Sequence, residues 1–142
     1  GASEAGGINI GFNISLPHEQ NENPYVTREL NFEFHYFFMR KFWFIYLAKA
    51  LVVFPGGFGT LDELFEVVTL DQTGKLSKPI KIVLFGAPYW KDIINFEALA
   101  DYGTISPEDL DMMFVTDTVD DAFAYITKEL TENALDYPGG IL

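Results

Sequence analysis

Three glycines and a threonine lie close together in the sequence PGGFGT, at residues 55–60. They separate a short apolar run at 50–54 from a segment with helical periodicity at 60–70, which predicts a turn from a buried strand into a helix. The first amides of a helix have no intrahelical partner, and its dipole favours an anion. Glycines also let the backbone approach a ligand closely and take positive φ. A phosphate site is one interpretation, and a tight turn that only allows close packing is the other.

Acidic residues follow directly after this turn, at Asp62, Glu63 and Glu66. Glu63 and Glu66 are three residues apart, so they share a face in a helix. Carboxylates repel a phosphate, but they suit a ribose or a carbon that becomes positively charged, as the anomeric carbon does in glycoside cleavage. Structural interpretations also exist, because Glu66 fits an exposed helix position and Glu63 fits a capping box with Thr60 as the N-cap.

Arg40 and Lys41 interrupt a strongly aromatic segment, residues 35–49, that is predicted to be a mostly buried helix. A charge in such surroundings is costly unless it is paired or faces a cleft. A carboxylate such as Glu63, or a ligand phosphate, would therefore suit Arg40. A structural ion pair or an arginine that extends to the surface is the alternative.

The composition excludes several classes of function. The 142 residues carry a net charge of −12, from 21 acidic and 9 basic residues, whereas general binding of DNA or RNA needs a basic surface. Cysteine is absent, which excludes a thiol nucleophile and fits a reducing compartment, so we expect a cytoplasmic protein. His18 and His35 are far apart, and no metal site is expected. The most apolar stretch, residues 42–54, is too short to span a bilayer, so no membrane partner is expected.

Alternating strand-like and helix-like segments predict the fold class. Alternation of apolar and polar residues predicts strands at 8–16 and 29–34, and continuous apolar runs predict central strands at 50–54 and 80–85. Helices are predicted at 35–49, 60–70, 89–102 and 119–130, with a short capped helix at 106–112 and a short strand at 114–115. We therefore expect one α/β domain over residues 1–142, with a mostly parallel sheet flanked by helices.

The segment PGGFGTLDE, at residues 55–63, resembles the PGGxGTxxE signature of the LOG family. This family comprises cytokinin riboside 5′-monophosphate phosphoribohydrolases and related nucleotide nucleosidases. Residues 39–41, Met-Arg-Lys, resemble the Arg-Lys element that precedes the signature. Similar spacing continues at Gln72, at residues 78–80, at Gly86 and at residues 89–90, so the resemblance covers about residues 1–130.

The resemblance implies a Rossmann-like domain that hydrolyses the N-glycosidic bond of a nucleoside 5′-monophosphate, such as AMP, to free base and ribose 5-phosphate. The family is also described as lysine decarboxylase-like, but that reaction would need pyridoxal phosphate and a lysine in a recognisable context, so no cofactor is expected. By the family pattern, the catalytic residues would be Arg40, Glu63 and Glu66, and the phosphate and nucleotide would be bound by Gly56, Gly57, Gly59, Thr60 and Lys41.

A carrier that binds a nucleotide or the molybdenum cofactor without turnover is the alternative function, because it would keep the same fold and phosphate site. Family members are dimers or larger, so a homodimer or higher homo-oligomer is expected, and the aromatic segment 34–46 suits a helix–helix interface. Relatives normally begin with further βα units and another glycine-rich loop. We expect this chain to be the C-terminal part of a larger LOG-type domain. The chain is then expected to start in the helix that follows this additional loop.

Overall fold

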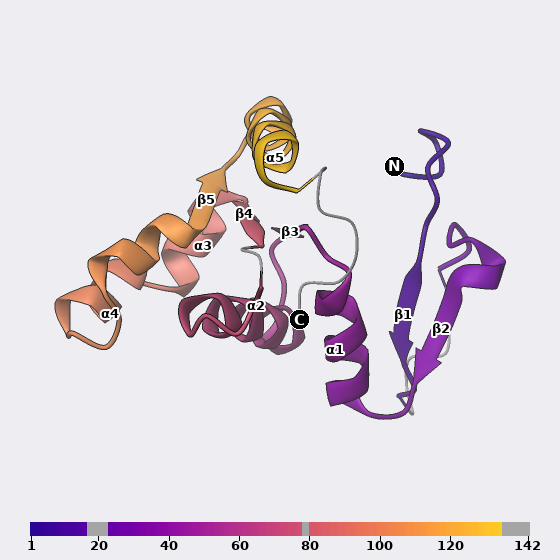
Figure 1. Ribbon diagram of the computed structural model, residues 1–142, viewed down its shortest axis with the longest axis horizontal. Helices are drawn as coiled ribbons and strands as arrows, with labels where there is room; N and C mark the ends of the chain where they lie inside the picture. Colours follow the sequence, from indigo (N-terminus) through magenta and orange to yellow (C-terminus); the bar gives the residue numbers. More distant parts are fainter. Residues whose placement is uncertain (17–22, 78–79, 135–142) are drawn as a thin grey trace. The chain divides into compact units, whose positions relative to one another are not determined.

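The computed structural model describes residues 1–16, 23–77 and 80–134 and divides into two compact units, Gly1–Tyr46 and Leu47–Leu142. Each unit contains parallel strands and helices, as the Rossmann-like α/β prediction requires (Figure 1). The single domain over residues 1–142 stays a prediction. Part of the expected polar loop at 18–24, including His18, lies outside the described residues, as do Lys78 and Pro79.

The first unit combines two paired strands with one helix. Its strands are parallel, with Gly11 opposite Asn31. The ring of Phe12 packs against the rings of Phe34 and Phe44, with centroids 5.6 and 6.4 Å away, and thereby joins the strands to the helix. The elements are β1 (Gly11–Ile14), the 3₁₀ helix η1 (Arg28–Leu30), β2 (Asn31–Phe34) and α1 (Phe37–Tyr46).

Each predicted element of the first unit is confirmed in type but is shorter than expected. The strand predicted at 8–16 is regular only at 11–14, and the strand predicted at 29–34 begins with the 3₁₀ turn η1. The helix predicted at 35–49 covers only 37–46. The prediction that this helix is mostly buried is wrong, because Ile45 is the only buried residue of α1 and aromatic side chains such as Phe38 and Phe42 are exposed. Apolar periodicity continues past the residues where backbone hydrogen bonding stops. The periodicity therefore predicts that an element is present more reliably than it predicts where the element begins and ends.

The second unit is a three-stranded parallel sheet in the order β3-β4-β5. β4 lies in the middle, and its residues Ile82, Val83 and Leu84 are completely buried, because both faces of a central parallel strand are covered. The elements are β3 (Ala50–Val53), α2 (Phe58–Gln72), β4 (Lys81–Phe85), α3 (Ala87–Ile93), α4 (Phe96–Asp101), the 3₁₀ helix η2 (Pro107–Met112), β5 (Met113–Thr116) and α5 (Val119–Asn133).

Helices cover both faces of this sheet. Figure 1 shows α2 and α3 on one side of the strands and α5 on the other. The ring of Phe114 in β5 stacks on Tyr125 of α5 with centroids 4.5 Å apart, whereas its neighbour Met113 faces α3 and α4. The strand–turn–helix–strand order at residues 50–85 is therefore confirmed as a parallel βαβ unit.

One predicted helix is two helices. The sequence predicts a single helix at 89–102, but α3 ends at Ile93 and α4 begins at Phe96. The side chain of Asn95 accepts a hydrogen bond from the amide of Ala98 at 3.0 Å and so caps the second helix. An asparagine inside an apolar pattern can therefore start a new helix, because its short amide satisfies amides that the break leaves unpaired.

Candidate functional site

The glycine turn lies at the carboxyl end of β3 and leads directly into α2. Gly57 is the N-cap of this helix, and the amide of Leu61 donates the first helical hydrogen bond to the carbonyl of Gly57 at 3.1 Å. The amides of Phe58, Gly59 and Thr60 precede that bond, so helix geometry leaves them without intrahelical acceptors. Three amides at the positive end of the helix dipole form a suitable environment for an anion.

The predicted capping box at this helix is wrong. Thr60 is expected as the N-cap with Glu63 as its partner, but α2 begins two residues earlier, at Phe58. Glycine is an acceptable N-cap residue without any side-chain hydrogen bond. The helix therefore includes Gly59 and Thr60 in its first turn, and the capping signal in the sequence did not determine where it starts.

The glycines of the turn differ in what surrounds them. A Cβ built on Gly56 would collide with the side chain of Thr60, whose own Cβ would be 2.9 Å away. No described atom lies within 4 Å of a Cβ built on Gly57 or Gly59. None of the three has positive φ, so that part of the prediction is wrong. Gly56 is needed for internal packing, whereas Gly57 and Gly59 leave open space in front of the helix amides.

The connection from β4 to α3 holds the glycine turn in place. The phenol of Tyr89 donates a hydrogen bond of 2.5 Å to the carbonyl of Gly56. Gly86 has a φ of +98°, and a Cβ there would lie 3.2 Å from Cγ of Pro55. The absence of a side chain at Gly86 thus lets the proline pack closely. Tyr89 is evident from the sequence only as part of the family spacing, because no local pattern relates a tyrosine to a turn 33 residues earlier.

The two candidate carboxylates both lie on α2, as predicted. At 100° per residue, Gly59, Glu63 and Glu66 fall on one face of the helix, away from the fully buried Leu64. Glu63 and Glu66 are half-buried, whereas the neighbouring Asp62 is exposed. The open space at Gly59 therefore adjoins Glu63, about 6 Å further along the helix axis.

Arg40 and Lys41 lie on α1, in the predicted helix, and both are half-buried. The guanidinium carbon of Arg40 is 5.5 Å from the centre of the Phe37 ring, close enough for a cation–π interaction. Arg40 belongs to the first unit and Glu63 to the second, so the catalytic pair stays a prediction.

The resolved pKa shifts belong to a different part of the second unit. Lys81, the first residue of β4, forms an ion pair of 2.9 Å with Glu129 and holds the pKa of that carboxyl below its ordinary value through this hydrogen bond. Burial raises the pKa of Asp71 and of Tyr125, and the charge of Lys81 partly opposes both shifts. The glycine turn is at the carboxyl end of β3, whereas this cluster is at the amino end of β4.

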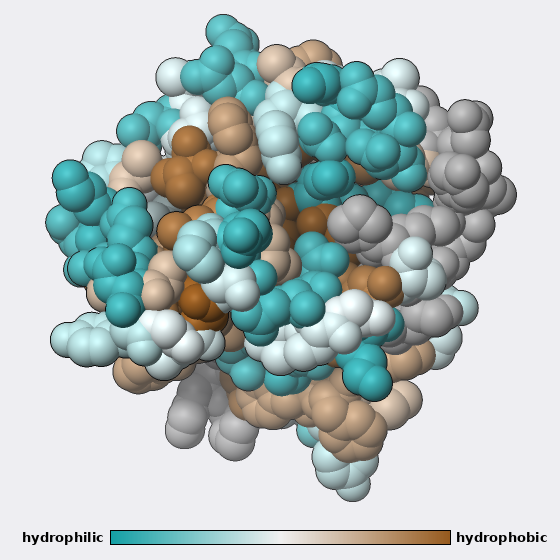
Figure 2. Space-filling model, turned by 60° about the vertical axis from the view of Figure 1, so that its left-hand side comes forward, coloured by the Kyte–Doolittle hydropathy of each residue, from teal (hydrophilic) through white to brown (hydrophobic). Residues whose placement is uncertain are grey.

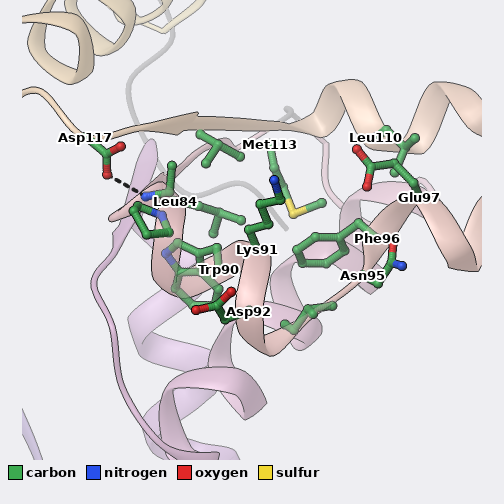
Figure 3. A pocket seen from close by; sticks show the side chains of 14 residues that line it. Leu84, Trp90, Lys91, Asp92, Asn95, Phe96, Glu97, Leu110, Met113 and Asp117 are labelled. Atoms are coloured by element: carbon green, nitrogen blue, oxygen red, sulfur yellow. Dashed lines mark hydrogen bonds between the residues drawn. The ribbon is translucent and has the colours of Figure 1, made fainter.

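A cavity of about 860 Å³ lies beside β5, between this strand and the helices α3 and α4. Figure 3 shows Trp90, Lys91, Phe96 and Met113 among the side chains around it. In Figure 2, which brings this side forward, apolar and hydrophilic residues alternate on the surface. No residue of the glycine turn lines the cavity. Its lining mixes apolar rings with charges of both signs and so does not define one kind of ligand.

The part of the chain that the structure describes contains neither a metal-binding cluster nor a membrane-spanning helix. Within residues 1–16, 23–77 and 80–134, no cluster of three or more His, Asp or Glu side chains could hold a metal ion. In the same ranges no helix combines the length and the apolar character needed to cross a bilayer.

The fold and the glycine turn define the class of protein. Residues 1–126 match the family model described as "Possible lysine decarboxylase", and this range includes the whole first unit and most of the second. The chain therefore belongs to this family, the LOG family that the PGGFGTLDE segment indicates.

Several curated relatives carry the name cytokinin riboside 5′-monophosphate phosphoribohydrolase. The protein of Mycobacterium tuberculosis (strain ATCC 25618 / H37Rv) is 38% identical over 80 residues, which are 53% of this chain and 40% of that protein. LOG7 of Arabidopsis thaliana is 39% identical over 61 residues, 42% of this chain and 28% of that protein. The protein of Rhodococcoides fascians is 32% identical over 81 residues, 56% and 40% of the two chains. The matched part of this chain thus spans less than half the length of these relatives.

Proposed function

We propose that the protein hydrolyses the N-glycosidic bond of a nucleoside 5′-monophosphate and releases free base and ribose 5-phosphate. One observation carries the proposal: the open backbone at Gly59 shares a helix face with two half-buried carboxylates, Glu63 and Glu66. An anion site and an acid site therefore adjoin each other on one element. The name of these relatives, which refers to a riboside 5′-monophosphate, supports the same substrate class.

The phosphate binds at the amino end of α2. The amides of the first helical turn donate to its oxygens, and the helix dipole adds a favourable field. Gly56, Gly57, Gly59 and Thr60 form this phosphate cradle, and Lys41 adds a positive charge. The cradle holds the phosphate at the 5′ end of the nucleotide. Because Glu63 and Glu66 lie further along α2, these acidic side chains face the ribose and not the phosphate.

The acids act at the anomeric carbon. Breaking the bond between this carbon and the base leaves positive charge on the sugar, and a nearby carboxylate stabilises that charge. A water molecule supplies the hydroxyl that joins the anomeric carbon, and its proton leaves with the base. Glu63 is the principal carboxylate, whether it takes the proton from water or only stabilises the charge. Glu66 supports it near the ribose, and Arg40 is the second member of the catalytic pair.

The test is a panel of nucleoside monophosphates, with AMP, GMP, CMP and a cytokinin riboside 5′-monophosphate as substrates. Released base is measured by chromatography, with the corresponding nucleosides as controls that lack the phosphate. Base release from the monophosphates that disappears in the Glu63→Gln variant supports the proposal. Asp62→Asn is the matched control, because it neutralises the exposed neighbouring acid and should leave the rate unchanged. Binding of nucleotides without release of base would instead identify a carrier.

A homodimer or higher homo-oligomer in the cytoplasm completes the proposal. The aromatic helix α1, with the sequence FFMRKFWFIY, supplies a large apolar surface for helix–helix packing. Light scattering on the purified protein measures the mass in solution, and a monomer at all concentrations would contradict the oligomer.

A further inference from the structure

A hydrogen bond from outside the glycine turn fixes the orientation of one peptide within it. The carbonyl of Gly56 accepts a bond from the phenol of Tyr89 at 2.5 Å, and this bond is partly buried. No peptide bond in the described chain is cis, so the carbonyl of Gly56 and the amide of Gly57 point in opposite directions across the same peptide plane. The bond to Tyr89 therefore turns the amide of Gly57 away from α3.

This external bond matters because the peptide joins two glycines. Glycine populates a wider range of backbone conformations than any other residue, so a Gly-Gly peptide has little intrinsic preference for one orientation. Gly57 has no side-chain cap of its own to hold it. The hydroxyl of Tyr89 supplies the missing constraint from a different helix.

The phenol itself is held by a rigid neighbour. Trp90 is 2% exposed, and its indole nitrogen donates to the carbonyl of Phe85 at 3.0 Å. The ring of Tyr89 packs edge-on against Trp90 with centroids 5.1 Å apart. A phenylalanine at position 89 would keep this packing, so the hydroxyl is the group that acts on Gly56.

We propose that Tyr89 is a positioning residue for the phosphate cradle. Its hydroxyl orients the Gly57 amide as an additional donor to the phosphate. This inference rests on the proposed nucleotide site. Tyr89 touches the backbone of the turn and acts on the ligand only through it, so its loss affects phosphate-bearing ligands and leaves the ribose and base contacts intact.

The experiment removes the hydroxyl alone, as Tyr89→Phe in the intact protein. Affinities for ribose 5-phosphate, AMP and adenosine are measured by calorimetry, together with kcat and KM for AMP. Loss of one neutral hydrogen bond predicts about two- to tenfold weaker binding of ribose 5-phosphate and AMP, unchanged binding of adenosine, and a raised KM with little change in kcat. Tyr102→Phe removes a phenol from a side chain that is 85% exposed, and it should change none of these values.

Gly57→Val separates this inference from the function it rests on. If Gly57→Val weakens phosphate binding and Tyr89→Phe does not, the role of Tyr89 is refuted while the cradle stands. If neither variant changes the affinity, the cradle itself is refuted. Equal losses for adenosine and ribose 5-phosphate in Tyr89→Phe would also overturn the inference, because they would indicate a general loss of structure.

Discussion

Replacing Gly56 by alanine should destabilise the protein, although the change adds only one methyl group. The new Cβ would meet three atoms of the Thr60 side chain, among them Cβ at 2.9 Å and Cγ2 at 3.2 Å. Rotation of the Thr60 side chain cannot relieve the contact with its Cβ, because the backbone fixes that atom within the first turn of α2. The glycine turn or the start of the helix must therefore move.

The expected cost follows from this overlap. Insertion of a methyl group into a closely packed site costs about 1–3 kcal/mol when backbone must shift. Since a domain of this size is stable by about 5–15 kcal/mol, a change of that size is readily measured. Thr60→Gly deletes all three of the contacting atoms, so the double variant should recover much of the loss. The two changes should then show a coupling free energy of about 1 kcal/mol or more.

Gly57→Ala is the matched control in the same turn. Gly57 has φ −86° and ψ −154°, which alanine can adopt, and no described atom lies within 4 Å of the added Cβ. The gain from a less flexible unfolded chain offsets the weaker N-cap, so the free energy of unfolding should change by less than about 0.5 kcal/mol. The methyl group would, however, occupy the space in front of the helix amides, and AMP should bind more weakly.

Urea denaturation gives the free energies of unfolding for the wild type, both single variants and the double variant, and calorimetry gives their affinities for AMP. Equal stability of Gly56→Ala and Gly57→Ala would contradict this prediction, and so would a Thr60→Gly change that relieves none of the loss in Gly56→Ala. In either case the contact between Gly56 and Thr60 does not limit the packing of the turn.

Glu63→Gln and Arg40→Ala should each lower the rate of base release by about a hundredfold or more, while the circular dichroism spectrum stays unchanged. Normal turnover in both would contradict the catalytic assignment. Glu129→Gln should lower stability at neutral pH, because Lys81 holds the pKa of Glu129 below its ordinary value of 4.5. That difference from the wild type is present above pH 4.5 and should vanish as the pH falls through the lowered pKa; a pH-independent difference would argue against the ion pair. Thr118→Ala removes the cap that accepts from the third amide of α5 and should cost about 1 kcal/mol in thermal unfolding.

Burial made the sheet of the second unit predictable from sequence. The apolar run KIVLF forms the central strand β4, because a parallel strand covered by helices needs apolar residues on both faces. The run ALVV also forms a strand, β3, but the prediction of a central strand is wrong there, because β3 lies at the edge of the described sheet and only its Val53 is buried. The capping pattern at Ser106 also predicts the helix that follows it, since Asp109 completes a capping box there. The same kind of pattern at Thr60 is misleading, because a glycine N-cap leaves no side-chain signal in the sequence.

Tertiary contacts in the site could not be predicted in the same way. The glycine turn and its acids are evident from spacing along one helix, whereas the bond between Tyr89 and Gly56 joins residues 33 positions apart. Only the parallel pairing of β3 and β4 brings the start of α3 beside the turn. The steric difference between Gly56 and Gly57 likewise depends on where the Thr60 side chain lies.

The parallel register of the second unit also sets how this sheet must form. Ala50 pairs with Lys81 and Ile82 with Met113, so each ladder joins segments that are about thirty residues apart. No pairing within it is a hairpin that could nucleate locally. Loop-closure entropy is lost before either ladder gains stability, which predicts slow refolding. β4 takes part in both ladders, so mutations there should slow folding more than equally destabilising mutations in β3 or β5.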